Sequence, residues 1–488
     1  MIKAEFGIQN NNTKTSYTKY FFISTRECRL FSMKKEKIGV LLPVFSLPGD
    51  HGIGDFSNYA YQFISWLKEH HYRYWQILPL NPVGPANSPY ITVCSEAIDI
   101  RYISLADLVE RGLLDKVPNH HANAGRVDYG SVLSFKEKYL RRAYKNSKIS
   151  LTNFKKNNPW VEAYAKYLVL KTINDNKPWN EWAITKVPSF ANDEINFHIW
   201  CQYIALDQWN NIKKFANKNK VKIIADCPFY VGLDSVDCYM NKSEFMLDEH
   251  YNPTLVSGCP PDAFSDDGQL WGTPIYNFEK MKENNYKFLI DRITCLASRA
   301  GILRLDHFRA FDTYCVIPAG DENARRGEWR VGPRNEFFDA LYARDPKIKI
   351  IAEDLGILFD SVHELRDYYH LPGMRVIQFC AFETLEENSN IILYPGTHDN
   401  QTLYGWLKCL SKEQRDILRK ELHHPKDLYG AIFNEVWNMT SLITIFPMQD
   451  LLKLDDRARI NHPGTVGEHN WTFKFKDMKF LETVKYGN

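Results

Sequence analysis

The chain has 488 residues, of which 44 % are hydrophobic, and its 61 lysines and arginines balance 59 acidic residues. A chain of this length can bury a large core, in two or three domains or in one barrel with insertions. Its near-neutral charge provides no field that would hold a polyanion or draw the chain to an acidic bilayer, and no apolar run approaches the roughly 18 residues of a membrane helix. We therefore expect neither nucleic acid nor a membrane as a partner.

The ten cysteines are scattered singly from Cys28 to Cys409, without a CxxC pair or zinc-like spacing. In a chain too large to need disulfide staples, this pattern indicates reduced thiols and a cytoplasmic location. Residues 1–32 are polar and rich in asparagine, and a second methionine, Met33, follows them. We expect residues 1–33 to be a non-core extension, disordered or part of a mis-assigned start, and residues 34–488 to form the folded domain.

Eight short apolar runs, rich in β-branched residues, are predicted to be strands. In chain order they are residues 38–43, 74–79, 222–229, 302–308, 349–354, 374–379, 391–397 and 442–447. Helical stripes lie between several of them, at 56–67, 289–300 (with Gly301 as the expected cap), 337–341 and 362–369. Alternating strands and helices favour an α/β fold, a (β/α)8 TIM barrel, over the alternative of a doubly wound sheet.

Two stretches are longer than the connections of a minimal (β/α)8 barrel. About 140 residues separate the second and third strands, and we expect a mostly helical subdomain inserted at about 84–195. Residues 232–276 are rich in Gly, Pro, Asp and Ser, which predicts a long irregular loop. Such loops at the carboxyl ends of barrel strands usually shape the site.

Four of the predicted strands end on an acid, at Asp226, Asp306, Glu353 and Asp399. Any one of them is compatible with a helix cap, but the carboxyl ends of barrel strands meet at one rim, where gathered like charges cost stability unless they bind or react. Paired carboxylates are what glycoside cleavage requires.

Other kinds of chemistry fit the sequence less well. A metal site is the competing use of these acids, but no histidine pair has ligand spacing, and His307 and His398 belong to different strands. GxSxG, GxGxxG and GxxxxGK motifs are absent from the sequence. We therefore expect no metal and no organic cofactor.

Several separate motifs carry a family resemblance. They are "LPVFSLPGDHGIGDF", "WQILPLNP" followed by "SPY", "DCPFYVGLDS", "GCPPDAFSDDGQLWGTPIY", "RLDHFRAF", "AEDLG", "LPGMRVIQF", "GTHDNQT" and "FPMQDLLKLDDRARINHPGT". In these motifs and their order the chain resembles glycoside hydrolase family 77, the amylomaltases, from about residue 38 to about residue 475. The resemblance implies a 4-alpha-glucanotransferase that moves segments of α-1,4-glucans and maltooligosaccharides between chains, with retention and without a cofactor.

The resemblance also implies roles for particular residues. Asp306 in "RLDHFR" would be the nucleophile, kept ionised by Arg304, and Glu353 in "AEDLG" the general acid/base. Asp399 in "THDN" would be the third catalytic carboxylate, which binds the hydroxyls of the donor sugar and favours its distorted, oxocarbenium-like state, and His398 would bind the same sugar. Further substrate-binding positions implied in this way are Asp226, Ser88, Tyr90, Gln269, Trp271 and Asn461.

The chain departs from the family pattern at Ala263 and Thr273, where Tyr and Asn are more usual, and after "SPY", which leaves the preferred chain length open. Two other functions fit the same residues. A hydrolase of the α-amylase type would pass the sugar to water, and a non-catalytic homologue would only bind glucan. Incubation with maltotriose separates them, because only transfer makes longer oligomers.

Overall fold

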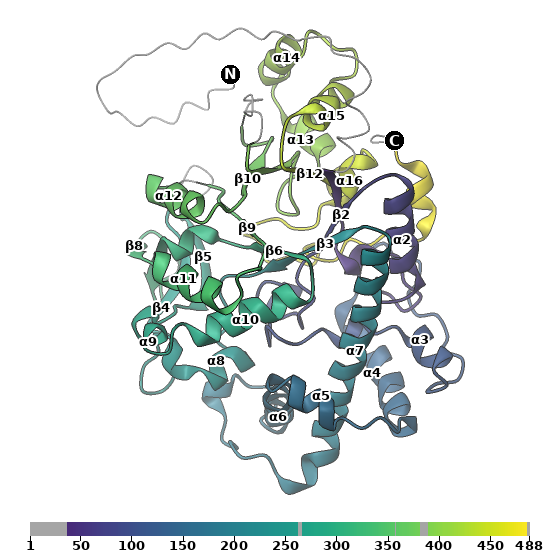
Figure 1. Ribbon diagram of the computed structural model, residues 1–488, viewed down its shortest axis with the longest axis vertical. Helices are drawn as coiled ribbons and strands as arrows, with labels where there is room; N and C mark the ends of the chain where they lie inside the picture. The colour runs from purple at the N-terminus through teal and green to yellow at the C-terminus, as the bar shows by residue number, and fades with distance from the viewer. Residues whose placement is uncertain (1–36, 262–265, 357, 381–388, 486–488) are drawn as a thin grey trace.

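The computed structural model describes residues 37–261, 266–356, 358–380 and 389–485 (Figure 1). The extension expected at 1–33 and Ala263 lie outside the described residues. Eight parallel strands pair in the order β10-β11-β12-β1-β2-β3-β6-β9. They are β1 (Ile38–Leu41), β2 (Tyr74–Gln76), β3 (Lys222–Cys227), β6 (Ile302–Leu305), β9 (Ile350–Ala352), β10 (Gly373–Val376), β11 (Ile391–Tyr394) and β12 (Ile443–Pro447).

The two edge strands of this sheet, β9 and β10, meet each other. The Ala352 N–H donates to the carbonyl of Pro372 at 2.8 Å, which nearly closes the sheet into a barrel. All eight strands predicted from the sequence are present, and each is shorter than expected. The (β/α)8 barrel is thereby confirmed.

The four predicted helices are also present, as α2 (Asn58–Glu69), α10 (Lys287–Ser298), α11 (Arg334–Arg344) and α12 (Asp360–Tyr368). The expected glycine cap of α10 is wrong. The helix ends at Ser298, and the N–H of Gly301 donates to the carbonyl of Ile223 at 3.1 Å, so this glycine already takes part in pairing with β3. The remaining barrel helices are α7 (Asn192–Lys218), α13 (Leu403–Cys409), α14 (Lys412–Glu421), α15 (Leu428–Asn438) and α16 (Met448–Leu451).

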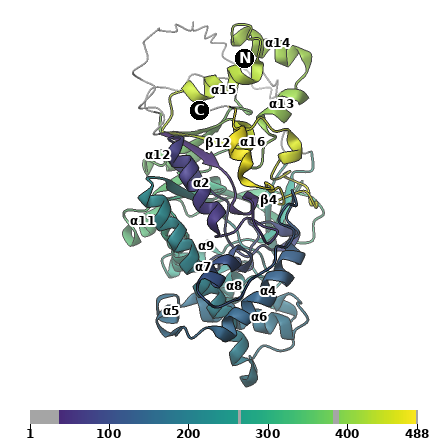
Figure 2. The same cartoon turned by 90° about the vertical axis from the view of Figure 1, so that its right-hand side faces the viewer.

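The segment between β2 and β3 is mostly helical. It contains α3 (Leu105–Glu110), α4 (Tyr129–Asn146), α5 (Thr152–Asn157) and α6 (Trp160–Ile173), followed by α7. Helices α4, α5 and α6 lie at one end of the molecule, and α13, α14 and α15 lie at the other (Figures 1 and 2). The subdomain boundary at about 84–195 stays a prediction.

The expectation of an irregular loop at 232–276 is wrong. After α8 (Val236–Met240), the segment forms β4 (Leu255–Cys259) and β5 (Gln269–Pro274), and α9 (Phe278–Glu283) follows it. These strands join β7 (Thr313–Pro318) and β8 (Glu328–Val331) in a second, antiparallel sheet of order β5-β4-β7-β8. A Cβ on Gly258 would lie 2.2 Å from the carbonyl oxygen of Gln269, so a glycine there reflects close strand approach and not irregularity.

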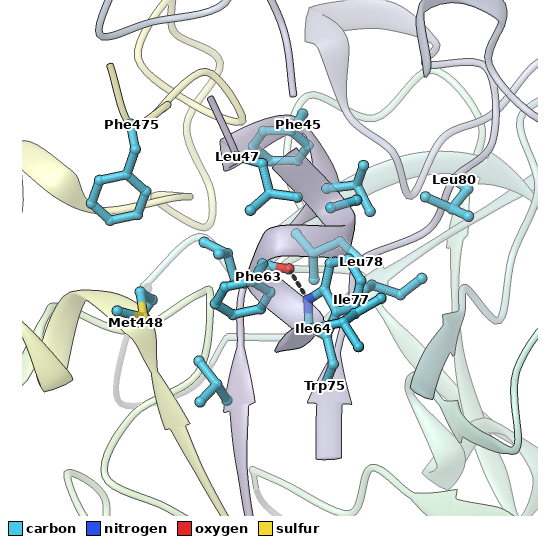
Figure 3. Close-up of a cluster of buried hydrophobic side chains, with 14 of the residues drawn as sticks. Phe45, Leu47, Phe63, Ile64, Trp75, Ile77, Leu78, Leu80, Met448 and Phe475 are labelled. Atoms are coloured by element: carbon cyan, nitrogen blue, oxygen red, sulfur yellow. Dashed lines mark hydrogen bonds between the residues drawn. The ribbon is translucent and has the colours of Figure 1, made fainter. Parts of the chain in front are cut away.

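Much of the aromatic content is core packing. Trp75, Trp200 and Trp209 are among the largest fully buried side chains. Figure 3 shows Trp75 beside Phe63 and Ile77, and its indole N–H donates to the carbonyl of Leu42 at 2.8 Å. Within the described ranges, no helix combines the length and apolarity needed to cross a membrane.

Candidate active site

The four strand-end acids stand at the carboxyl ends of β3, β6, β9 and β11. Asp226 is the fifth residue of β3, Asp306 and Glu353 directly follow β6 and β9, and Asp399 lies five residues beyond β11. Because β3, β6 and β9 are adjacent parallel strands, their ends bring the first three acids together.

Arg304 lies at the centre of this group. Its Nη1 donates to both carboxylate oxygens of Asp226, at 2.8 and 2.9 Å, and to Asp306 Oδ1 at 2.9 Å. Arg304 lies on β6 and Asp306 directly follows it, two residues further along the chain, and the hydrogen bond between them brings their side chains to the same side. In the described part of the chain no group of His, Cys, Asp and Glu is arranged to hold a metal ion, and the cation among these acids is the guanidinium.

Glu353 is held by main-chain donors on both oxygens. The N–H of His307 donates to Oε2 at 2.7 Å, and the N–H of Leu355 donates to Oε1 at 3.1 Å. Main-chain bonds from Glu353 N–H to Leu305 and from Phe308 N–H to Glu353, both 3.0 Å, continue the pairing of β6 with β9. This continuation sets Glu353 beside the segment that carries Asp306.

Asp399 belongs to a second chain of contacts. The Tyr90 hydroxyl donates to Asp226 Oδ2 at 2.7 Å and lies 2.9 Å from His398 Nε2, which in turn lies 3.3 Å from Asp399 Oδ2. Asn461 Nδ2 donates to the other Asp399 oxygen at 2.7 Å. The Tyr90 hydroxyl uses its proton in the hydrogen bond to Asp226, so toward His398 its oxygen can only accept. His398 must therefore carry its proton on Nε2. Burial lowers the pKa of His398, which keeps this ring neutral.

The site has an accessible layer above a buried one. The side chains of Asp306 and Asp399 keep 28 % and 41 % of their surface exposed, whereas Asp226, Arg304 and His398 are buried. Asp226 was expected to bind substrate, but its side chain is fully buried and both of its oxygens are engaged. Its hydrogen bonds orient Arg304 and Tyr90.

The environment opposes ionisation of the two central carboxyls together. Burial raises the pKa of Asp306, Arg304 lowers it, and the charges of Asp226, Glu353 and Asp399 raise it further. Burial also raises the pKa of Glu353, and Arg304 again opposes the rise. Arg304 therefore offsets only part of the cost of charge, and the Asp306–Glu353 pair retains a proton more readily than two isolated carboxyls would.

Three other predicted residues lie around this centre. Ser88 Oγ accepts the N–H of Tyr90 at 3.3 Å, so it orients that residue. Gln269 and Trp271 share one face of β5, and the Trp271 indole N–H donates to Gln269 Oε1 at 3.2 Å. The Trp271 ring stands edge-on to the ring of His307, with centroids 4.9 Å apart.

Sequence reasoning missed two residues of this site, Arg459 and Trp471. Arg459 donates to the carbonyls of Asp399 (2.6 Å) and Asn461 (2.7 Å), and its position two residues before Asn461 was a usable signal. Trp471 packs against Tyr90 and His398 with centroids 5.5 and 6.0 Å away. Nothing in its local sequence indicated this position.

Comparison with known proteins identifies the family. The family model described as 4-alpha-glucanotransferase matches residues 42–480. The chain belongs to the 4-alpha-glucanotransferase family. A 4-alpha-glucanotransferase of Streptococcus pneumoniae is 36% identical over 487 residues, covering 93% of this chain and 96% of its own length, and one of Aquifex aeolicus is 34% identical over 473 residues, covering 92% and 97%.

Solved structures agree with this assignment. An amylomaltase from Streptococcus agalactiae in complex with acarbose superposes with a TM-score of 0.85 at 30% identity, covering 93% of this chain and 99% of that one. An amylomaltase from Corynebacterium glutamicum, at 16% identity and a TM-score of 0.73, covers 93% and 74% and shows the same fold. The chain is thus a 4-alpha-glucanotransferase, which transfers a segment of an α-1,4-glucan to the 4-hydroxyl of an acceptor with retention.

Proposed function

We propose that Asp306 is the nucleophile of this transfer and that Glu353 is its general acid/base. The observation that carries the proposal is the Arg304 contact. The guanidinium donates directly to Asp306 Oδ1, whereas Glu353 accepts hydrogen bonds from the main-chain N–H groups of His307 and Leu355. With one proton between the two carboxyls, the direct cation contact and the exposed surface of Asp306 favour its ionised form. The proton then resides on Glu353.

The two half-reactions follow from this arrangement. In the first, Glu353 gives its proton to the glycosidic oxygen while Asp306 attacks the anomeric carbon, so the bond to the leaving glucan breaks and an ester forms. Esterification removes the charge of Asp306, and this loss lowers the pKa of Glu353. In the second, Glu353 takes the proton of the acceptor 4-hydroxyl, whose oxygen displaces Asp306.

The remaining residues divide between binding and support. Asp399, with His398 and Asn461 beside it, would bind the hydroxyls of the donor sugar, since its side chain is the more exposed of this group. Gln269 and Trp271 would line the acceptor side. Asp226, Tyr90 and Ser88 would act as supports, because their hydrogen bonds go to Arg304, His398 and one another.

The proposal also covers the substrates and the location of the protein. The carboxylate pair suits α-1,4-glucans and maltooligosaccharides, and the similar amylomaltase from Streptococcus agalactiae was solved in complex with acarbose. A cytoplasmic location is supported by the nine described cysteines, none of which forms a disulfide.

The Glu353→Gln variant tests the acid/base role. We expect it to be nearly inactive on maltotriose, because glutamine has no proton for the leaving oxygen, and to recover in part on α-maltosyl fluoride with azide, which need neither acid nor base. The measurement compares turnover of the two substrates in wild type and variant. Equal losses on both would remove Glu353 from this role.

The Asp226→Asn variant tests the charge balance. The charge of Asp226 raises the pKa of Asp306, and its removal also frees N–H groups of Arg304, so both effects lower that pKa. The acidic limb of the pH profile of kcat/KM, where the pair takes up its second proton, should move to lower pH by about one unit. Asp312→Asn, at a buried aspartate bound to Arg334, is the matched control. A limb that stays in place or moves upward contradicts the assignment.

A further inference from the structure

His307 has a backbone conformation that is uncommon for a residue other than glycine. Its φ of 50° and ψ of 47° lie in the left-handed region. This turn comes directly after Asp306 and points the His307 N–H at Glu353 Oε2, 2.7 Å away. One residue therefore joins the main chain of the nucleophile to the carboxyl of the acid/base.

The ring of His307 packs among aromatic side chains. It stands at 89° to the ring of Trp271, and the rings of Phe229 and Tyr230 are centred 6.3 and 6.2 Å away. Burial, together with the charge of Arg309, lowers the pKa of His307 to about 3, so the ring is neutral at working pH. Its Nε2 is buried and has no hydrogen-bond partner among the described residues. The ring thus serves as a packing surface for Trp271 and not as a proton donor.

We infer that His307 is a positioning residue for the second half-reaction, whose main chain orients Glu353 as base and whose ring holds Trp271 on the acceptor side. This inference rests on the roles proposed above for Glu353 and Trp271. Transfer exceeds hydrolysis only if a sugar hydroxyl is held where the base can reach it and water is placed poorly. His307 touches both groups that this requires, so it couples acceptor placement to the base.

The charged groups around Glu353 fix the sign of the expected pH effect. The charged groups that interact with Glu353 are Arg304, Asp306, Arg309 and Asp354. None of these changes when His307 is replaced. The N–H of residue 307 stabilises the carboxylate of Glu353, so losing that hydrogen bond raises the pKa of Glu353. The alkaline limb of the pH profile should then move to higher pH.

Two variants separate the contributions of the ring and the main chain. His307→Asn removes the ring but keeps a residue that tolerates the left-handed region, whereas His307→Val also disfavours that region, because a branched Cβ crowds the backbone. For His307→Asn we expect the ratio of reducing ends released to oligomers elongated from maltotriose to rise about 5-fold, with the alkaline limb in place. For His307→Val we expect the same rise and a shift of that limb upward by about one pH unit.

A double variant tests whether the ring of His307 acts through Trp271. Trp271→Ala alone should raise the same ratio, and Trp271→Ala with His307→Asn should raise it no further, because the ring acts through Trp271. Additive effects would overturn the coupling. So would a wild-type ratio in folded His307→Asn, or an unmoved limb in folded His307→Val.

The Glu353→Gln variant distinguishes failure of this inference from failure of the proposed function. If Glu353→Gln retains the alkaline limb with maltotriose, Glu353 is not the titrating group and the proposed function falls. If Glu353→Gln abolishes the limb while His307→Val leaves it unmoved, only the role of His307 is wrong. Circular dichroism and the melting temperature of each variant establish that it is folded.

Discussion

Replacing Asp306 with asparagine is expected to lower turnover of maltotriose by at least ~10³-fold while leaving the fold intact. The amide has the volume of the carboxylate and can accept the Arg304 N–H that now binds Oδ1 at 2.9 Å. It cannot form the ester, so cleavage of the donor stops at its first step. Initial rates of glucose release from maltotriose measure the loss.

The control for this variant is Asp115→Asn, at an exposed aspartate in the segment between β2 and β3, which should retain wild-type turnover. Circular dichroism and the melting temperature of Asp306→Asn separate loss of chemistry from loss of fold. Turnover within a few fold of wild type would remove Asp306 from the nucleophile role.

Replacing Lys136 with methionine is expected to destabilise the protein by ~3–5 kcal/mol. Lys136 on α4 is fully buried, and its ammonium donates to Asp55 Oδ2 (2.6 Å) and to the carbonyls of Arg101 (2.6 Å) and Ile103 (2.8 Å). Methionine fills much of the space but leaves the buried carboxylate of Asp55 without its cation. Asp55 follows β1 and Lys136 lies on α4, so the ion pair connects the helical segment to the barrel.

Urea denaturation followed by tryptophan fluorescence measures this change in the free energy of unfolding. The matched control is Lys138→Met, at an exposed position of the same helix, with an expected change within about 0.5 kcal/mol. The double variant Lys136→Met with Asp55→Asn should recover part of the loss, because the unpaired charge is then gone. Equal stability of Lys136→Met and Lys138→Met would show that the buried pair contributes nothing.

The barrel could be predicted from sequence because each of its strands is a short apolar run between helical stripes. Each run spans only a few residues, and in the structure all eight strands are shorter than predicted but overlap their predicted ranges. The antiparallel sheet could not be predicted in this way. Gly258 reads as a loop residue, yet it lies in β4, and a Cβ there would lie 2.2 Å from the carbonyl oxygen of Gln269 on the paired strand. Such cross-strand proximity leaves no periodic signal in the chain.

Of the candidate site, only the gathering of acids at the strand ends could be predicted from the sequence. The placement of acids at strand ends is enough to gather Asp226, Asp306 and Glu353 at one rim, because barrel topology fixes where strands end. Which of these acids is exposed depends on contacts between side chains that are far apart in the sequence. The hydroxyl of Tyr90 meets Asp226 across 136 positions and His398 across 308, and no local pattern encodes either contact.

Trapping the covalent intermediate tests the central claim most directly. The Glu353→Gln variant, incubated with α-maltosyl fluoride, lacks the base that would clear the ester and uses a leaving group that needs little acid, so the intermediate should accumulate. Mass spectrometry of the digested protein locates the added sugar. The proposed roles predict a maltosyl group on the peptide that carries Asp306, and absent from the same peptide of the double variant with Asp306→Asn. A maltosyl group on Asp399, or on any other residue, would contradict them.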